Sequence, residues 1–161
     1  LDGTLDQVQH YNKNFILQYV EKDSKYSGMI DWREVYGADN KVTRLETDEN
    51  RNGRMDVFQY FSENGHLARV EYDTFHDGKI DRWEFFGAKE ALESVHFDTN
   101  HDQIPDQWQY YNNSTQLVRV EHDSNFDGKA DRWEYFDDFG SMERIEFDND
   151  HDGTLDIVKR R

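Results

Sequence analysis

Apolar and polar residues alternate along short stretches of this chain, which is the pattern of a strand whose two faces differ. Residues 118–122, VRVEH, place two valines on one face and Arg119 and Glu121 on the other, where we expect solvent-exposed ion pairs. The same alternation occurs at residues 68–72, 82–85, 132–135 and 143–147. Turn-forming residues cluster at 37–40, 62–65, 112–115 and 137–140. The pattern predicts antiparallel strands joined by tight turns.

The strands and turns belong to a repeat of 25 residues. A glycine recurs at this interval and is replaced once, by Gln103: Gly3, Gly28, Gly53, Gly78, Gly128 and Gly153. Aspartates five residues before it and three residues after it keep the same phase, which indicates units that bury apolar surface against their neighbours. We therefore predict one repeat domain over residues 1–161. It consists of a partial repeat at 1–21, repeats at 22–46, 47–71, 72–96, 97–121 and 122–146, and a partial repeat at 147–161.

The most complete copy of the repeated loop is DSNFDGKADRWE at residues 123–134. It has oxygen side chains at loop positions 1, 3, 5, 9 and 12, glycine at position 6 and a backbone carbonyl at position 7. This is the ligand order with which a short loop wraps Ca²⁺. Glu134 is the candidate ligand at position 12. In a strand it would instead lie on the charged face, and Asp131 would close the coordination shell.

Four other loops keep most of these oxygen ligands, and we expect about three to five Ca²⁺ ions per chain. Their candidate ligands are Asp148, Asp150, Asp152 and Asp156; Asp98, Asn100, Asp102 and Asp106; Asp48, Asn50, Asn52 and Asp56; and Asp73, Asp77 and Asp81. The loop at 23–31 has Lys25 and Ser27 at positions 3 and 5, so we predict no ion there. The alternative is that Asp, Asn and Gly occur here because they favour turns and local hydrogen bonds.

These loops resemble the Asp-x-Asp/Asn-x-Asp-Gly-x-x-Asp calcium loops of thrombospondin type 3 repeats, dockerins and integrin α-propeller hairpins. The copy at 123–134 also satisfies the EF-hand pattern. The resemblance implies that Asp123, Asn125, Asp127, Lys129 (through its carbonyl) and Asp131 bind one ion. It implies the same of Asp148, Asp150, Asp152, Thr154 and Asp156. The strand sequence at 64–73 loosely resembles the tyrosine-aspartate repeats of bacterial Rhs-type shell proteins.

The residues between successive loops decide between a helical and a β unit. Residues 85–97 are too few for two helices and a linker, because a helix rises about 1.5 Å per residue. Only residues 88–93 have a helical composition, and most of the equivalent segments contain turn residues. We therefore predict an all-β fold: an antiparallel meander in which each repeat is strand, calcium loop, strand and tight turn. The sheet is predicted to be curled, closed into a barrel or solenoid-like.

The composition of the chain limits the classes of partner and metal ion that it can bind. With 35 acidic against 19 basic residues the chain carries a net charge of −16, which argues against a nucleic-acid partner. Without cysteine, a metal site here must use oxygen ligands and a hard cation. No apolar run reaches the roughly 20 residues of a membrane span. Because the chain begins at Leu1, within a loop whose first half is missing, we expect a mature product or part of a longer array with neighbouring repeats.

An aromatic column at Phe58, Trp83, Trp108 and Trp133 fits either core packing, which we favour, or a carbohydrate platform. We predict no enzyme, because the carboxylates form a regular array without the single break that a catalytic site introduces. The predicted function is a calcium-binding structural or adhesive module of a bacterial secreted or cell-surface protein, whether extracellular, periplasmic or lipid-anchored. The alternatives are a carbohydrate-binding module with structural calcium and a piece of an Rhs-like β-shell. A protein or a glycan partner is left open.

Overall fold

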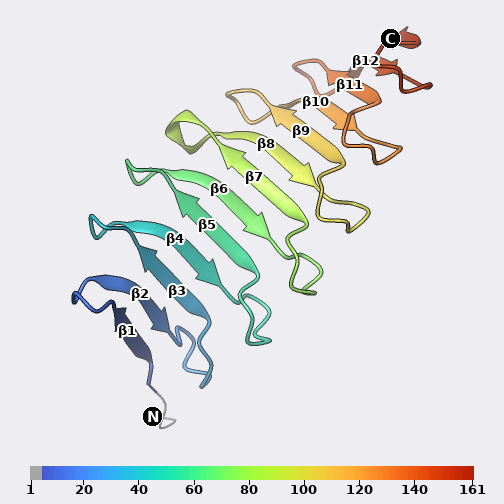
Figure 1. Ribbon diagram of the computed structural model, residues 1–161. Coiled ribbons are helices and arrows are strands. Elements are labelled where there is room, and N and C mark those ends of the chain that lie inside the picture. The colour runs from blue at the N-terminus through green and yellow to red at the C-terminus, as the bar shows by residue number, and fades with distance from the viewer. Residues whose placement is uncertain (1–4) are drawn as a thin grey trace. The chain divides into compact units, whose positions relative to one another are not determined.

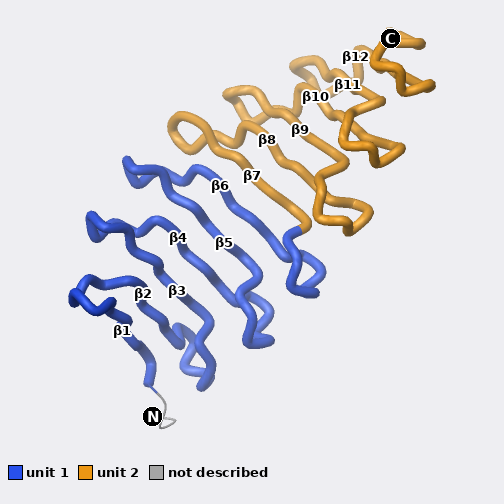
Figure 2. Tube along the Cα trace, viewed as in Figure 1, with its two compact units in different colours: residues 1–80 blue, residues 81–161 orange. Residues whose placement is uncertain are grey.

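The computed structural model describes residues 5–161, so Gly3 of the first partial loop lies outside the described residues. These residues form β-strands and one short helical turn (Figure 1). The chain divides into two compact units, residues 1–80 and 81–161 (Figure 2). The first contains β1 (Gln7–Tyr11), β2 (Leu17–Lys22), β3 (Trp32–Tyr36), β4 (Val42–Thr47), β5 (Val57–Phe61) and β6 (Leu67–Tyr72). The second contains β7 (Arg82–Phe86), β8 (Leu92–Phe97), β9 (Gln107–Tyr111), β10 (Leu117–His122), β11 (Arg132–Phe136), β12 (Met142–Phe147) and β13 (Ile157–Arg160).

Within each unit every strand pairs antiparallel with its neighbours in the sequence. The strand order is therefore linear in both units, and neither sheet closes on itself. The acidic loops connect strands at one end of the sheet and the tight turns connect them at the other (Figure 1). The predicted all-β antiparallel meander is confirmed, and its sheet is open.

One face of the sheet carries a row of small apolar side chains. In β10, Val120 lies opposite Gln109 of β9 and Glu134 of β11, so the row alternates between apolar and polar residues across the strands. The buried hydrophobic residues are all valines: Val20, Val57, Val70, Val95 and Val120. With both faces partly polar, the fold depends on cross-strand pairs as much as on apolar burial.

The opposite face carries aromatic and charged residues. Arg119 lies over the ring of Tyr110, 4.2 Å from its centroid, and forms an ion pair of 3.1 Å with Glu121, which also accepts a hydrogen bond from the Tyr110 hydroxyl. The same triad recurs as Tyr135, Arg144 and Glu146 and, in the first unit, as Tyr60, Arg69 and Glu71. The expectation of solvent-exposed ion pairs is wrong for the glutamates, because tyrosine and arginine cover them and Glu146 is buried.

The aromatic column lies on this charged face and not with the valines. Trp133 pairs across the strands with Glu121 and Glu146, and Trp83 and Trp108 are, like it, only half-buried. The prediction that the tryptophans form the core is therefore wrong: the valine row holds the buried hydrophobic residues. The aromatic rings pack instead against arginine and glutamate stems on a face that stays partly accessible.

Hairpin turns occur at all the predicted positions. In the turn after β9, for example, the N–H of Asn112 donates to the carbonyl of Gln116, and the N–H of Thr115 donates back to Asn112. The helical composition of residues 88–93 produces only a 3₁₀ turn, Ala88–Glu90, before β8 begins. Among residues 5–161 no helix is long and apolar enough to cross a lipid bilayer.

Candidate metal sites

Each acidic loop takes a path with two left-handed residues. In the loop at 123–131, Phe126 at position 4 has φ of 60° and Gly128 at position 6 has φ of 88°. Glycine adopts such angles without strain, whereas other residues adopt them at a cost of order 1 kcal/mol. Gln103 has φ of 76°, as its place in the glycine column predicted. Position 4 gave no such signal, because it is occupied throughout by residues other than glycine: Tyr26, Arg51, His76, His101, Phe126 and His151.

The aspartate at position 1 holds this path. The carboxylate of Asp123 accepts hydrogen bonds from the N–H of Asp127 at 3.2 Å and of Gly128 at 2.7 Å. The equivalent N–H of position 6 bonds to the first aspartate in every described full loop. The position 1 aspartates are all buried: Asp23, Asp48, Asp73, Asp98, Asp123 and Asp148. Each loop is therefore wrapped around one buried carboxylate.

The aspartate at position 9 closes the loop and joins it to the next. The carboxylate of Asp131 accepts hydrogen bonds from the backbone and hydroxyl of Ser124 at 2.8 and 2.9 Å. Its N–H donates to the carbonyl of His122, and its own carbonyl accepts the N–H of Asp148 at 2.9 Å. The backbone hydrogen bonds of the sheet therefore continue through the aspartates at both ends of the loop.

Side chains at positions 3 and 5 are exposed, apart from the half-buried Asn100, and those with oxygen atoms accept hydrogen bonds from the backbone of their own loop. Asn125 accepts a bond from the N–H of Asp127, and Asp127 accepts one from the N–H of Lys129 at 3.0 Å. The loops containing Asn50 with Asn52 and Asn100 with Asp102 repeat these bonds. Such Asx turns form without an ion, so they fit the turn alternative and the metal prediction equally well.

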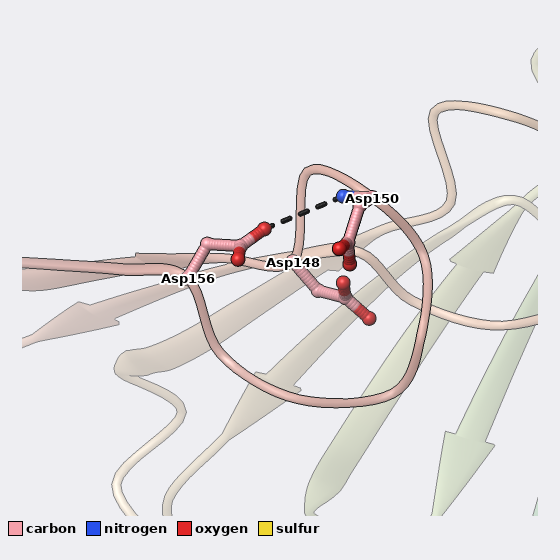
Figure 3. A group of neighbouring side chains, drawn as sticks. All are labelled: Asp148, Asp150 and Asp156. Atoms are coloured by element: carbon pink, nitrogen blue, oxygen red, sulfur yellow. Dashed lines mark hydrogen bonds between the residues drawn. The ribbon is translucent and has the colours of Figure 1, made fainter.

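The loop at 148–156 brings three carboxylates together. Oxygen atoms of Asp148, Asp150 and Asp156 lie within 4.8 Å of one another (Figure 3). Oδ2 of Asp148 accepts the N–H of Gly153, but Oδ1 is buried and has no hydrogen-bond partner. An unsatisfied buried carboxylate oxygen costs about 1–3 kcal/mol or more, and a hard cation held by the three carboxylates would satisfy it. The residues present therefore fit a calcium ion.

The other predicted ligands of this loop take different positions. The carboxylate of Asp152 accepts bonds from the hydroxyl and N–H of Thr154, and these bonds lower the pKa of Asp152 below its ordinary value. The side chain of Thr154 is thereby engaged, whereas the resemblance assigned the metal contact to its carbonyl. No other group of three acidic, histidine or cysteine side chains with this spacing occurs among the described residues. In residues 5–161 this loop is the strongest candidate site.

The loop at 23–31 contains a cation of its own. Nζ of Lys25 lies 3.8 Å from Oδ2 of Asp31, which is buried. Asp31 also accepts bonds from the N–H and hydroxyl of Ser24, and Ser27 donates its N–H to Asp23. The carboxylates of this loop therefore have hydrogen-bond and ion-pair partners within the loop itself, and the absence of an ion there stays a prediction.

The loop at 73–81 spans the boundary between the two units. Within the first unit, Asp73 accepts bonds from the N–H of Asp77 at 3.1 Å and of Gly78 at 2.8 Å. Within the second, Asp81 is buried and its carbonyl accepts the N–H of Asp98. Glu134, the candidate at position 12, lies in β11 and forms an ion pair with Arg132. It occupies the strand, as the second interpretation required, but it lies opposite Val120 and Ile145, on the face of the valine row and not on the face of Glu121 and Glu146 as that interpretation expected.

Histidines at position 4 reach the preceding loop. Nδ1 of His76 lies 3.5 Å from Asp56, and Nδ1 of His151 lies 3.6 Å from Asp131. In both cases the partner is the ninth-position aspartate of the loop before, 20 residues earlier in the chain. The sequence analysis did not find this contact, although the constant 20-residue separation is visible in the sequence.

The comparisons with known proteins add no relative. No model of a known protein family matches this chain, and no curated protein shows significant similarity to it. The function proposed below therefore rests on the geometry of the loops and of the sheet.

Proposed function

We propose that this chain is a calcium-binding structural module, in which ions held by the acidic loops stiffen one end of a β-meander. The observation that carries the proposal is the buried, unpartnered Oδ1 of Asp148, with oxygens of Asp150 and Asp156 within 4.8 Å. Three carboxylates at this distance repel one another, and a divalent cation between them removes both the repulsion and the unsatisfied oxygen.

The distribution of charge supports the same proposal for the other loops. In the full loops the aspartates at positions 1 and 9 are buried, except for the exposed Asp156, in a chain whose net charge is −16: Asp23, Asp31, Asp48, Asp56, Asp73, Asp81, Asp98, Asp106, Asp123, Asp131 and Asp148. Backbone N–H groups offset part of this charge. Bound cations would offset much of the remainder, and we propose Ca²⁺ because every candidate ligand is an oxygen.

The setting that suits such a module is outside the cell. Loops with few charged ligands bind calcium in the range of about 10⁻⁴–10⁻³ M, which extracellular calcium saturates. We therefore propose a segment of a secreted or surface protein, bacterial as the Rhs-like strand sequence suggests, that serves as a spacer or adhesive scaffold. A structural role needs no catalytic group. In this proposal the ion-bound loops make the spacer or scaffold rigid.

The test is a calorimetric count of ions together with thermal unfolding in EGTA and in millimolar calcium. We expect about three to five ions and a clear rise in the melting temperature, because calcium at about ten times its Kd stabilises by about 1.4 kcal/mol for each site that it occupies. The near-ultraviolet circular dichroism of the tryptophans should weaken on chelation. Superimposable melting curves and spectra in both buffers would refute the proposal.

A further inference from the structure

The second unit interrupts its own pattern at one place. Where neighbouring repeats have tyrosine, arginine and glutamate, the hairpin β7–β8 has Phe85, Ser94 and His96. The replacement removes one positive and one negative charge from the same face of the sheet. The first unit also departs from the triad, with Val35 in place of the tyrosine and with His10 and Tyr19 in place of the tyrosine and arginine, but it keeps the glutamates Glu46 and Glu21. Among the hairpins of residues 5–161, β7–β8 is the one that replaces both the arginine and the glutamate, and a regular array that loses both charges in one hairpin indicates a site there.

The register gathers these residues with two tryptophans. His96 lies opposite Trp83 of β7 and Trp108 of β9. Ser94 lies opposite Phe85 and Tyr110 on the same two strands. We name these six side chains the β7–β9 patch: Trp83, Phe85, Ser94, His96, Trp108 and Tyr110. All share one face of the sheet, and all except the buried Ser94 are half-exposed.

The middle of the patch is aromatic and uncharged. The ring of His96 packs against Phe85, with centroids 4.7 Å apart, and lies 6.5 Å from Tyr110. Its Nε2 is 3.2 Å from the hydroxyl of Ser94, and burial lowers its pKa, so the imidazole is neutral at pH 7. Trp133 in the same column lies between two glutamates, Glu121 and Glu146, whereas Trp108 lies between His96 and Glu121, at the edge of the patch.

The patch also contains polar groups that the protein leaves unused. Within residues 5–161, the indole N–H groups of Trp83 and Trp108 and the Nδ1 atom of His96 have no hydrogen-bond partner. Indole N–H groups are donors only, and they find an acceptor when a ligand covers them. A ligand that suits this surface has apolar faces for the rings and neutral acceptors at its edge. Arg119 and Glu121 border the patch beside Tyr110 and Trp108, but they are paired with each other, so a charged ligand would lose its water here without gaining a free counter-charge.

We propose that the β7–β9 patch binds a neutral oligosaccharide, whose sugar rings stack on Trp83 and Trp108 and whose hydroxyls meet the indole N–H groups and His96. β7 and β9 are separated by one strand, so the backbones that carry the two indoles are about 9.6 Å apart, near the length of a disaccharide. This activity is separate from the calcium loops, and neither proposal depends on the other.

The test titrates the whole chain, in saturating calcium, with a panel of neutral oligosaccharides and with matched acidic ones. The indole N–H resonances of the tryptophans report each ring separately. We expect a neutral glycan to shift the signals of Trp83 and Trp108 and to leave those of Trp32 and Trp133 in place. Replacing Trp108 with alanine should weaken binding about tenfold or more, whereas Trp133→Ala should change it less than twofold.

A second variant keeps the fold while removing the site. Phe85→Tyr, Ser94→Arg and His96→Glu together rebuild the triad of the neighbouring repeats, so the strands should pair and melt as before. We expect this triple variant to lose glycan binding. Three results would overturn the proposal: no response to any neutral glycan at millimolar concentration, binding that survives in the triple variant, or tryptophan shifts caused only by a proline-rich peptide or by self-association.

Discussion

The loops at residues 23–31 and 148–156 follow the same path but satisfy their carboxylates differently. In both, the N–H at position 6 bonds to the first aspartate, at 2.6 Å in one and 2.8 Å in the other. The earlier loop then places the ammonium of Lys25 3.8 Å from Asp31. The later loop has carboxylates at the equivalent positions and leaves Oδ1 of Asp148 without a partner.

The difference separates two properties that the loop sequence combines. Aspartates at positions 1 and 9 and the left-handed residue at position 6 determine the backbone path, which forms even where an ion is not expected. Positions 3 and 5 then decide whether the loop contains its own cation or lacks one. The glycine at position 6 and the aspartates at positions 1 and 9 therefore predict the backbone path of the loop. The residues at positions 3 and 5 predict whether the loop binds an ion.

The largest effect should come from Asp148→Asn in the later loop. It removes the charge from the buried oxygen, and we expect calcium affinity at this site to fall about 100-fold, since charged ligand number sets the affinity of such loops. Calorimetry would record one ion fewer per chain at the same calcium concentration. The matched change Asp23→Asn should leave the number of ions unaltered, and an equal loss in both variants would erase the contrast between the loops.

The reciprocal experiment adds a site to the earlier loop. Lys25→Asp with Ser27→Asp removes the internal ammonium and supplies carboxylates at positions 3 and 5. We expect one additional ion per chain at millimolar calcium, and a calcium-dependent rise in melting temperature larger than that of the unaltered chain. Lys25→Ala alone removes the cation without adding ligands and serves as the control. An unchanged ion count in the double variant would show that the path is not sufficient for binding.

A smaller effect concerns the backbone that all these loops share. Gln103 occupies the left-handed position with φ of 76°, so Gln103→Gly should stabilise the chain by about 1 kcal/mol. Urea unfolding in EGTA measures this change without a contribution from ions. The opposite substitution, Gly128→Gln, is matched because no atom lies within 4 Å of the added Cβ, and it should destabilise by a similar amount. If both substitutions raised the free energy of unfolding, or both lowered it, the cost assigned to a left-handed glutamine would be wrong.

The smallest expected effect is the pH dependence of stability that arises from Asp23 in the loop at residues 23–31. The N–H of Ser27, with that of Gly28, holds the pKa of Asp23 below its ordinary value of 3.8. A lowered folded-state pKa stabilises above the unfolded value, and this stabilisation is lost as the pH falls through the folded value. In EGTA the difference in stability between the unaltered chain and Asp23→Asn should therefore be constant above pH 5 and shrink below about pH 4. If the difference in stability between the two chains instead grew as the pH fell, the pKa of Asp23 would be raised by folding and not lowered.

The sequence determined the meander, its turns and the phase of its loops, because alternation and turn residues act locally. It misplaced the core, since Trp133 and Val120 both follow a period of two and only the strand register shows that they lie on opposite faces. It also missed the contact of His151 with Asp131, which depends on how neighbouring loops stack. The break at Ser94 and His96 was present in the sequence, but it became visible only once the recurring triad defined what belongs there.

The bond from the N–H of Asp148 to the carbonyl of Asp131 has a consequence for how such a chain grows and folds. Among residues 5–161 each strand pairs with its neighbours in the sequence, so contacts are short-range and the array can form from any hairpin outward. Whole blocks of 25 residues can then be gained or lost without changing the neighbours they leave behind. The length of the array becomes a property that selection can adjust one hairpin at a time.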